Sequence, residues 1–463
     1  MRGVKRLGWM MLGVLTAVVL PCTGHAADKS SSDKALEDRV RALERKVDQQ
    51  QQGEATEQKS VTDRVNAIEK EVKDNEKTLL EKTGISIHGM VAVDYLFDIN
   101  RPDAVVNGVR VTQPFLRVFE NEKNSFTLNL ANLHFERAVE NQPGFVIDLD
   151  FGKTADVVNN TTFFGRHCSA SDVANGTCAT LGAPITGNGT DFFDVRQFYL
   201  TYTVPVGSGI KLKAGRFVTL AGAEVIKSYN NFNYNITNSI LFGFAIPFTH
   251  TGLMASYAFT DQVSLDLGVV NGWDSVADNN DGKSLHSGLT LAFDPHITFY
   301  QTVMYGPEQT GRTVLDNNNV PLVVHAGRSK RLLLTSLLTI KPIDPLTLII
   351  DYNYGNDSDS VPRDGLLRTA QWQGVAGYII YNFTDDLSAT LRAEVFDDTD
   401  GARTGARATY SEVSPTITYK IADGLFWRNE YRHDESDTKK VFAHEGNFVR
   451  GQDTIATELI YAF

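Results

Sequence analysis

From residue 84 to the end of the chain, apolar and polar residues alternate with a period of two in about sixteen segments. In the first segment, Ile85, Val91 and Val93 fall on one face, and His88 and Asp94 fall on the other. The same alternation recurs later, for example in residues 144–151, 261–270 and 386–396. Successive side chains of a strand point to opposite faces, so each segment predicts a β-strand with one apolar face.

The connections between the predicted strands alternate between short and long. The short ones are tight turns at residues 259–261, 293–295, 341–345, 383–386 and 421–424. Between them lie stretches of about ten to forty residues that are rich in Asn, Asp and Gly. Short turns at one rim and long loops at the other are typical of an outer-membrane β-barrel, whereas a soluble β-sandwich has no reason to separate them.

Aromatic residues stand at the ends of the predicted strands. The short-turn rim has Phe259, Phe293, Phe383 and Phe463, and the long-loop rim has Trp273, Tyr305 and Tyr354. Amphipathic rings prefer the headgroup level at both membrane interfaces, whereas a soluble core would hold them in mid-strand. This distribution also favours a membrane-spanning barrel.

The last residues of the chain predict how the barrel closes. Residues 454–463 continue the alternation up to Phe463. Lipid offers no hydrogen bonds, so a sheet in a membrane must have no open edge. We therefore expect residues 454–463 to pair with the strand that begins near Ile85. The predicted fold class is an all-β membrane protein, a transmembrane antiparallel β-barrel of about 16 strands over residues 84–463.

A different pattern precedes the barrel. Residues 28–82 contain no aromatic residue and are dense in charged residues and Gln. Their apolar residues step by three and four through Leu36, Val40, Leu43, Val47, Val61, Val65, Ile68, Val72 and Leu79. This seam predicts an α-helical coiled coil over residues 27–83, with a solvated linker as the alternative. Such a narrow apolar stripe needs a partner chain, and self-association as two or three strands is the simplest.

The first 26 residues predict the compartment. Arg2, Lys5 and Arg6 precede a short apolar run, and small residues follow as far as Ala26. This order is typical of a secretory signal peptide, residues 1–26. A transmembrane anchor is a weaker alternative because the run is shorter than the ~20 residues of a spanning helix. A lipid-anchored start at Cys22 is another weak alternative. The barrel would then lie in the bacterial outer membrane, among its lipids, with the coiled coil in the periplasm.

Charge and cysteine content narrow the possible partners. The chain has 44 basic and 56 acidic residues, a net charge of -12, which makes it a poor candidate for binding nucleic acid. Beyond the predicted leader there are two cysteines, Cys168 and Cys178, and an even pair in a secreted chain suggests one disulfide. A metal site that includes His167 is a less favoured alternative. Haem-attachment motifs are absent from the sequence.

Four stretches go beyond the general pattern of a barrel. They are RVFENEKNSFTLNLANLHFERA (117–138), PFTHTG (247–252), VVNGWDSVADNNDGK (269–283) and DDTDGARTG (397–405). Together they resemble the β-barrel porins of the OmpL-like family over most of residues 84–463. The resemblance implies an outer-membrane porin without catalytic residues. The coiled coil lies outside the similarity and looks like the periplasmic extensions of some other trimeric porins, so we expect a homotrimer held by the barrel and the coiled coil.

A barrel of about sixteen strands is too wide for side chains to fill, so it encloses water and something must narrow it. By resemblance to porins of this size, the third long loop, residues 219–247, folds inward and forms the constriction. Five of its residues would face the pore: Glu224, Lys227, Asn230, Asn231 and Asn233. The alternative is an external loop that packs on neighbours or forms a subunit contact.

Strand parity predicts which charges face the lumen. The set contains both signs: Asp148, Asp150, Arg216, Arg392, Glu394, Arg428 and Arg432, with Asp266, Asp351, Glu412, Glu430, Glu458, Lys211 and Lys213. Charge at the narrow point of a pore sets its selectivity, and a mixed set suits a transverse field that orients small polar solutes. For more than half of these charges, the simpler interpretation is ordinary solvation of the lumen.

Two sequence patterns that could indicate catalysis or cofactor binding are incomplete. Residues 278–284 end in Gly-Lys-Ser, but Ala277 stands where a phosphate-binding loop needs Gly. Two acidic turns could ligate calcium, but both lack the later Glu of a full loop. We therefore expect no enzyme, metal or cofactor, but a porin through which small hydrophilic solutes or ions diffuse passively. The alternative is a structural outer-membrane anchor whose coiled coil contacts the cell wall.

Overall fold

The computed structural model describes Arg41 and residues 63–68, 70–71, 83–101, 104–106, 109–111, 114–120, 122–139, 142–160, 192–316, 318–325, 327–437 and 439–463. The chain divides into two units, Met1–Asn75 and Glu76–Phe463, and the described residues of the first are helical. The predicted leader, the predicted disulfide and most of the predicted coiled coil lie outside the described residues. These features, and the domain boundary after residue 83, stay predictions.

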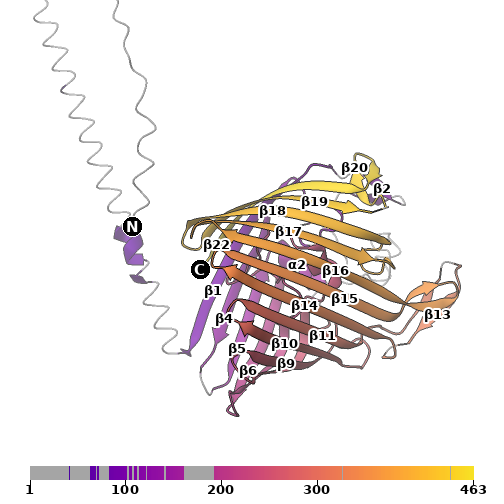
Figure 1. Cartoon of the computed structure of the whole chain (residues 1–463), viewed down its shortest axis with the longest axis horizontal. Coiled ribbons are helices and arrows are strands. Elements are labelled where there is room, and N and C mark those ends of the chain that lie inside the picture. Colours follow the sequence, from indigo (N-terminus) through magenta and orange to yellow (C-terminus); the bar gives the residue numbers. More distant parts are fainter. Residues whose placement is uncertain are drawn as a thin grey trace, which may run out of the picture. The chain divides into compact units, whose positions relative to one another are not determined.

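Sixteen antiparallel strands of the second unit form a closed barrel within the described residues (Figure 1), which confirms the predicted fold. In chain order they are β1 (Ile85–Asp98), β4 (Ser125–Arg137), β5 (Gly144–Phe151), β6 (Phe193–Val204), β7 (Ile210–Val218), β8 (Thr249–Ala258), β9 (Val263–Val270), β10 (Ser284–Asp294), β11 (Ile297–Pro307), β14 (Lys330–Ile343), β15 (Leu346–Arg363), β16 (Leu366–Asn382), β17 (Leu387–Asp398), β18 (Ala408–Ala422), β19 (Leu425–Ser436) and β22 (Gly451–Ala462). Each pairs with the next barrel strand along the chain, as expected for up-and-down connections.

The first and last strands close the barrel. β22 pairs antiparallel with β1, and beyond it Gly89 and Phe463 exchange two backbone hydrogen bonds of 2.9 Å. Glycine is required at this seam, because a Cβ on Gly89 would lie 2.7 Å from the Phe463 ring and 2.8 Å from the Asn132 carbonyl oxygen. The predicted pairing of residues 454–463 with the strand that begins near Ile85 is confirmed.

Turns and loops separate between the two rims as predicted. Each of the five predicted tight turns joins two neighbouring barrel strands. The connection from β15 to β16 differs from the expectation, because two long strands extend past the rim and meet in a tight turn at Asp364 and Gly365. Gly365 has a φ of 74°, a conformation that favours glycine and suits a hairpin turn.

Five of the seven aromatic residues predicted for the rims follow the prediction, Trp273 does not, and Tyr354 is half-buried in the middle of β15. Phe259, Phe293, Phe383 and Phe463 are exposed on the short-turn rim, and Tyr305 is exposed on the other. The prediction is wrong for Trp273, which packs inward among the long loops. Its ring lies 6.2 Å from the Trp372 ring and 4.8 Å from the Arg331 guanidinium carbon. Trp273 therefore contacts aromatic and cationic side chains of the protein instead of the membrane interface.

Lipid-facing and lumen-facing side chains alternate along the barrel wall. On β17, Leu391 and Val395 are exposed on the outer face, whereas Arg392 and Glu394 are buried on the inner face. Apolar side chains cover the outer face because lipid cannot satisfy polar groups. The predicted parity of this strand is therefore confirmed.

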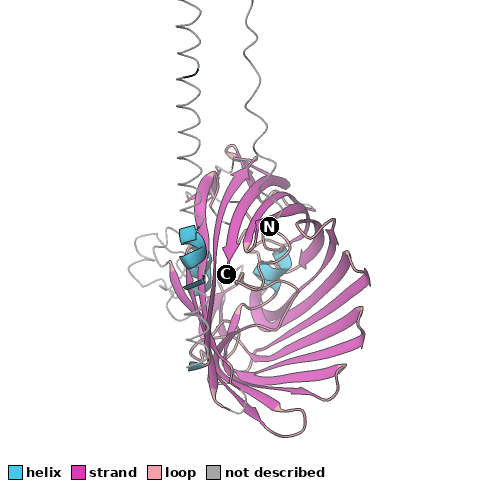
Figure 2. Ribbon diagram, turned by 90° about the vertical axis from the view of Figure 1, so that its left-hand side faces the viewer, coloured by secondary structure: helices cyan, strands magenta, loops and turns pink. Residues whose placement is uncertain are grey.

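The remaining elements lie in the long connections. They are α2 (Lys153–Asn160), the π-helix η1 (Leu241–Ala245) and three hairpins, β2 (Ala104–Val106) with β3 (Val109–Val111), β12 (Arg312–Leu315) with β13 (Pro321–Val324), and β20 (Phe442–His444) with β21 (Asn447–Val449). Figure 2 shows loop segments and a helical turn inside the ring of strands. Among the described residues, no helix combines the length and apolar character needed to cross a membrane.

Candidate functional site

The connection between β7 and β8, residues 219–248, lies inside the barrel and is here named the inner loop. Its two ends adjoin, because a Cβ on Gly222 would lie 2.9 Å from the Ile246 side chain. Between these ends the inner loop extends as far as β22, where Lys227 Nζ lies 2.6 Å from Glu458 Oε1. The structure therefore places the segment predicted for the constriction within the lumen.

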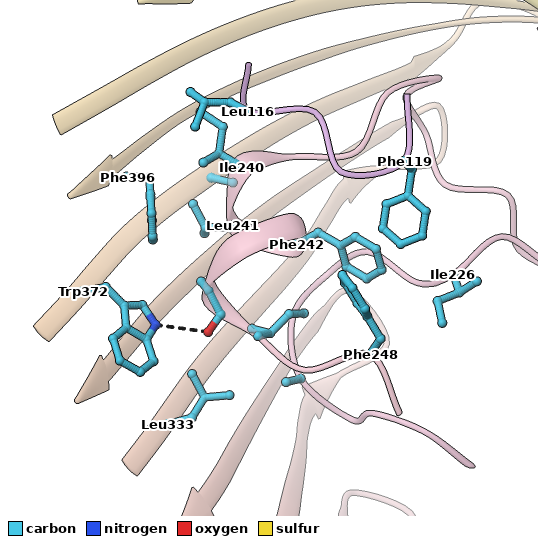
Figure 3. Close-up of a cluster of buried hydrophobic side chains, with 14 of the residues drawn as sticks. Leu116, Phe119, Ile226, Ile240, Leu241, Phe242, Phe248, Leu333, Trp372 and Phe396 are labelled. Carbon is cyan, nitrogen blue, oxygen red and sulfur yellow. Dashed lines mark hydrogen bonds between the residues drawn. The ribbon is translucent and has the colours of Figure 1, made fainter. Parts of the chain in front are cut away.

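An apolar cluster attaches the inner loop to the barrel wall (Figure 3). Its buried side chains include Leu116, Phe119, Ile240, Leu241, Phe242, Phe248, Leu333, Trp372 and Phe396. Trp372 Nε1 donates to the Ala245 carbonyl oxygen at 3.1 Å. A Cβ on Gly355 would lie 2.1 Å from the Trp372 ring, so glycine leaves room for the indole. Each fully buried large apolar side chain contributes roughly 1.5–3 kcal/mol, which stabilises a loop with little regular structure.

Two wall carboxylates accept hydrogen bonds from the backbone of the inner loop. Glu430 on β19 accepts from the N–H groups of Ile236 at 2.7 Å and Thr237 at 3.1 Å. Glu394 on β17 accepts from two successive N–H groups where η1 begins, at 2.6 and 3.1 Å. Buried backbone groups must find partners, and an irregular loop cannot supply its own. These carboxylates therefore satisfy the buried backbone of the inner loop.

Buried arginines of the wall bind the carbonyl groups of the inner loop. Arg392 Nη1 donates to the Thr237 carbonyl oxygen at 2.7 Å, and Arg428 Nη1 donates to another loop carbonyl at 3.2 Å. Arg196 on β6 and Arg432 on β19 bond further carbonyls of the same loop. Three of these arginines, Arg392, Arg428 and Arg432, are charges that parity assigns to the lumen.

The same charges also pair with one another. Arg392 lies 2.7 Å from Glu224 and 3.0 Å from Glu412, and Arg428 lies 2.8 Å from Glu458. Buried charges need such partners because their desolvation is costly. A transverse field would need the two signs on facing walls. These pairs instead neutralise each other on neighbouring strands or between the wall and the inner loop, which differs from that expectation.

The five residues predicted for the constriction occupy two environments. Glu224 and Lys227 are buried and paired with charges of the wall, whereas Asn230 and Asn231 are exposed and Asn233 is half-buried. All of them except Lys227 line a cavity of about 500 Å³, here named the inner chamber. The asparagines are therefore the predicted residues that face open space.

A second group of predicted lumen charges lies on β5 to β7. Asp148 and Asp150 contact the Arg196 guanidinium at 3.2 and 3.4 Å, and Arg216 lies 2.9 Å from Asp194. All five side chains are buried. The sequence prediction did not include Arg196 and Asp194, although they hold the three predicted residues in place.

The first long loop also reaches into the lumen. Arg117 Nη2 lies 2.8 Å from Asp434 Oδ2, and both side chains are fully buried. Glu120 accepts a hydrogen bond from the Asn238 N–H at 3.0 Å. Burial raises the pKa of Glu120 to about 7, although nearby Lys227 and Arg117 act in the opposite direction. Glu120 therefore contacts the inner loop from a buried position that disfavours its charged form.

A cavity of about 460 Å³, here named the outer pocket, lies among the long loops. The Arg403 guanidinium carbon is 4.9 Å from the Trp273 ring centroid and 5.1 Å from that of Trp372. Burial and the neighbouring Arg331 lower the pKa of Arg403 to about 10. Burial raises the pKa of Asp274 to about 6. The loops around the outer pocket therefore combine stacked aromatic rings with buried charges.

The barrel, its inner loop, the inner chamber and the outer pocket are the architecture of a channel. Residues 84–463 match the family described as "Putative beta-barrel porin-2, OmpL-like". The chain belongs to this family. It is an outer-membrane porin, and the resemblance seen in residues 117–138 and three later stretches is confirmed.

Two solved structures are similar to this porin. OprB of Pseudomonas putida is 10% identical, with a TM-score of 0.50, and the match covers 83% of the porin and 96% of OprB. The outer membrane channel DcaP of Acinetobacter baumannii is 13% identical, with a TM-score of 0.48, and the match covers 82% and 97% of the two chains. At 10% identity the likeness to OprB shows the fold alone. No curated protein matches the porin sequence.

Proposed function

We propose that small hydrophilic solutes diffuse passively through this porin and that the inner loop is its constriction. The observation that carries the proposal is the attachment of the inner loop to β17, β19 and β22 within a barrel of sixteen strands. A barrel of this width encloses water, and a segment held within the lumen reduces the area that remains open. The family membership and the geometry support the same function.

Partly buried polar side chains on the wall from β7 to β11 are evidence for a water-filled path beside the inner loop. Lys213, Asp266 and Tyr300 lie on this wall and are only partly buried. By contrast, Arg392 and Glu430 are buried where the inner loop contacts β17 and β19. Solutes would therefore pass along β7 to β11, whereas the inner chamber opens between the inner loop and strands β15 to β19.

We also propose a homotrimer that is held by the barrel walls and by a periplasmic coiled coil in residues 27–83. In the first unit, Val65 and Ile68 belong to the predicted seam and are 47% and 58% exposed in the single chain. Partner helices would remove these side chains from water. This exposure supports self-association through the helical segment.

The family and the barrel are those of a channel, and we propose no catalytic activity. Within the part of the chain that the structure describes, no cluster of three or more His, Cys, Asp or Glu is arranged to hold a metal ion. The alternative of a structural anchor requires no passage of solutes. A transport measurement therefore separates the two functions.

Liposome swelling tests the proposed function. Vesicles that contain the purified porin should swell in isotonic solutions of small neutral solutes, and the rate should fall as the solute becomes larger. This size dependence follows from diffusion through a narrowed aqueous lumen. Vesicles without protein serve as the control. Swelling no faster than in these control vesicles, with the barrel folded, would favour the anchor instead.

A further inference from the structure

The tip of the inner loop is a rigid platform at the inner chamber. The backbones of Ser228 and Asn231 exchange hydrogen bonds of 2.8 and 3.1 Å. The Asn233 side chain donates to the carbonyl oxygen of Val225 and accepts from its N–H, at 2.9 and 3.0 Å. The Tyr229 ring stacks on His88 of β1, with centroids 4.6 Å apart. A platform held in this way presents its other side chains in one geometry.

Two asparagines of this platform face the inner chamber with unused donors. Asn230 Oδ1 accepts from Ser228 Oγ at 2.7 Å, and Asn231 Oδ1 accepts from the Asn233 N–H at 3.0 Å. Both side chains are exposed, and neither amide NH₂ group donates a hydrogen bond to a described residue. Each NH₂ group carries two donors, so the platform offers four donors to a solute.

The barrel wall of the inner chamber adds hydroxyl groups and aromatic rings. Ser388, Thr390 and Thr418 line it, and none of their hydroxyls forms a side-chain hydrogen bond to a described residue. Phe232 and Phe426 also line it, with ring centroids 5.0 Å apart. The chamber therefore combines apolar ring surface with neutral donors and acceptors. Its volume of about 500 Å³ is within the usual size of a small-molecule site.

Glu224 is the one Asp, Glu, His, Lys or Arg among the lining residues, and both of its carboxylate oxygens are fully hydrogen-bonded. Its Oε1 accepts from Arg392 Nη1 at 2.7 Å and from the Tyr378 hydroxyl at 3.0 Å. Its Oε2 accepts from Asn238 Nδ2 at 3.0 Å and from the Ser239 N–H at 2.9 Å. Four hydrogen bonds use the acceptor capacity of a carboxylate. The inner chamber therefore presents no unpaired charge from its described lining.

The inner chamber connects with the short-turn rim. Ser388, Thr418 and Phe426 also line a neighbouring cavity of about 350 Å³. That cavity continues to Asp385 and Asp386 in the turn between β16 and β17. A solute that enters from this rim would reach the asparagine platform without passing the inner loop.

We propose that the inner chamber is a binding subsite for neutral polyhydroxylated solutes, that is, for sugars. The many hydroxyl groups of a sugar can form hydrogen bonds with the amides and hydroxyls of the inner chamber. Its apolar C–H faces can pack against the aromatic rings. An ion would gain little, because selectivity for ions requires charge or a ring of oriented dipoles. This inference rests on the proposed function and specifies the solute class.

The test records ion current through single porins in a planar bilayer while maltose or glucose is added on either side. Sugar in the inner chamber should reduce the current in a saturable way. The double variant Asn230→Ala, Asn231→Ala should raise the half-blocking sugar concentration by about tenfold, as the loss of two neutral hydrogen bonds predicts. Asn279→Ala removes an exposed amide from the outer pocket and should leave that concentration unchanged.

The outcomes separate this inference from the proposed function. A porin that conducts but shows no block by either sugar would overturn the sugar subsite and leave the diffusion channel intact. Stronger block by gluconate than by glucose would also overturn it, because an anion would then be preferred. If the Asn230→Ala, Asn231→Ala double variant and Asn279→Ala raised the half-blocking sugar concentration equally, the sugar would bind outside the inner chamber, which would also overturn the subsite. A folded porin without ion current would overturn the proposed function itself.

Discussion

Replacing residues 223–245 of the inner loop with a short Gly-Ser linker is expected to raise the single-channel conductance of the porin several-fold. A short linker can bridge the gap because Gly222 adjoins Ile246. The replacement clears a lumen that sixteen strands make too wide for wall side chains to fill. The measurement compares the variant with the wild-type porin in planar lipid bilayers under the same salt conditions.

The β12–β13 hairpin provides a matched control for this experiment. Arg312 pairs with Val324 at its base, so the same linker can replace residues 313–323. The hairpin forms a separate two-stranded sheet outside the barrel wall, and its loss should leave the conductance unchanged. If the inner-loop variant folded and conducted no more than the wild type, the inner loop would not be the constriction.

The barrel should fold without the inner loop. Arg392 keeps its ion pair with Glu412 at 3.0 Å, and Arg428 keeps its ion pair with Glu458 at 2.8 Å. Water can enter the emptied lumen and hydrate the groups that the loop backbone satisfied, so no buried charge is left without a partner. The far-ultraviolet circular dichroism of the variant should therefore keep its β signal.

The substitution Arg392→Met is expected to lower the free energy of unfolding by about 3–5 kcal/mol, the range for breaking a buried ion pair by removing one partner. The Arg392 side chain is fully buried between Glu224 and Glu412 and also donates to the Thr237 carbonyl oxygen. Methionine fills part of the volume but leaves Glu224 without its cation, and Glu412 keeps only Arg432 at 3.7 Å. Urea unfolding in lipid vesicles, followed by tryptophan fluorescence, measures the loss.

Two further variants identify the cause of this loss. Combining Arg392→Met with Glu224→Gln and Glu412→Gln removes both carboxylates that paired with Arg392 and should restore most of the stability. Lys420→Ala removes a partly exposed cation that lies 2.8 Å from the fully exposed Asp423, and it should leave the unfolding curve unchanged. Wild-type stability of Arg392→Met would mean that this charge cluster does not hold the inner loop in place.

The barrel could be predicted from the sequence because each strand repeats one simple rule. On β17 the alternation of Leu391 and Val395 with Arg392 and Glu394 directly reports which side chains meet lipid. The closing strand followed from the same rule, since a sheet in lipid cannot leave an edge unpaired. These features depend on neighbours in the sequence or on the solvent, and both are visible without the structure.

The rule fails where a strand contains a bulge. Phe198 and Leu200 are exposed on the lipid face of β6. If the alternation continued without interruption toward the start of the strand, Asp194 and Arg196 would lie on the same face. In the structure the register with β5 shifts at Arg196, so both charged side chains turn into the lumen. Two charged residues at positions that the alternation assigns to the lipid face could have indicated this bulge from the sequence alone.

The attachment of the inner loop could not be predicted from any local pattern. Its backbone at Ile236 and Thr237 bonds Glu430, and no periodicity relates residues so far apart in the chain. Its inward course was expected from resemblance to other porins alone. Parity identified Glu394 and Glu430 as lumen-facing but did not reveal that they bind loop backbone rather than face water.

Single-channel recording of the wild-type porin in a planar lipid bilayer tests the central claim most directly. A channel whose constriction is the inner loop predicts stepwise openings in symmetric salt, with three equal steps for a homotrimer. Under a salt gradient the reversal potential should stay close to zero, because most charges of the lumen are neutralised in pairs. A folded barrel that inserts into the bilayer and passes no current would contradict the claim that this chain forms a diffusion channel.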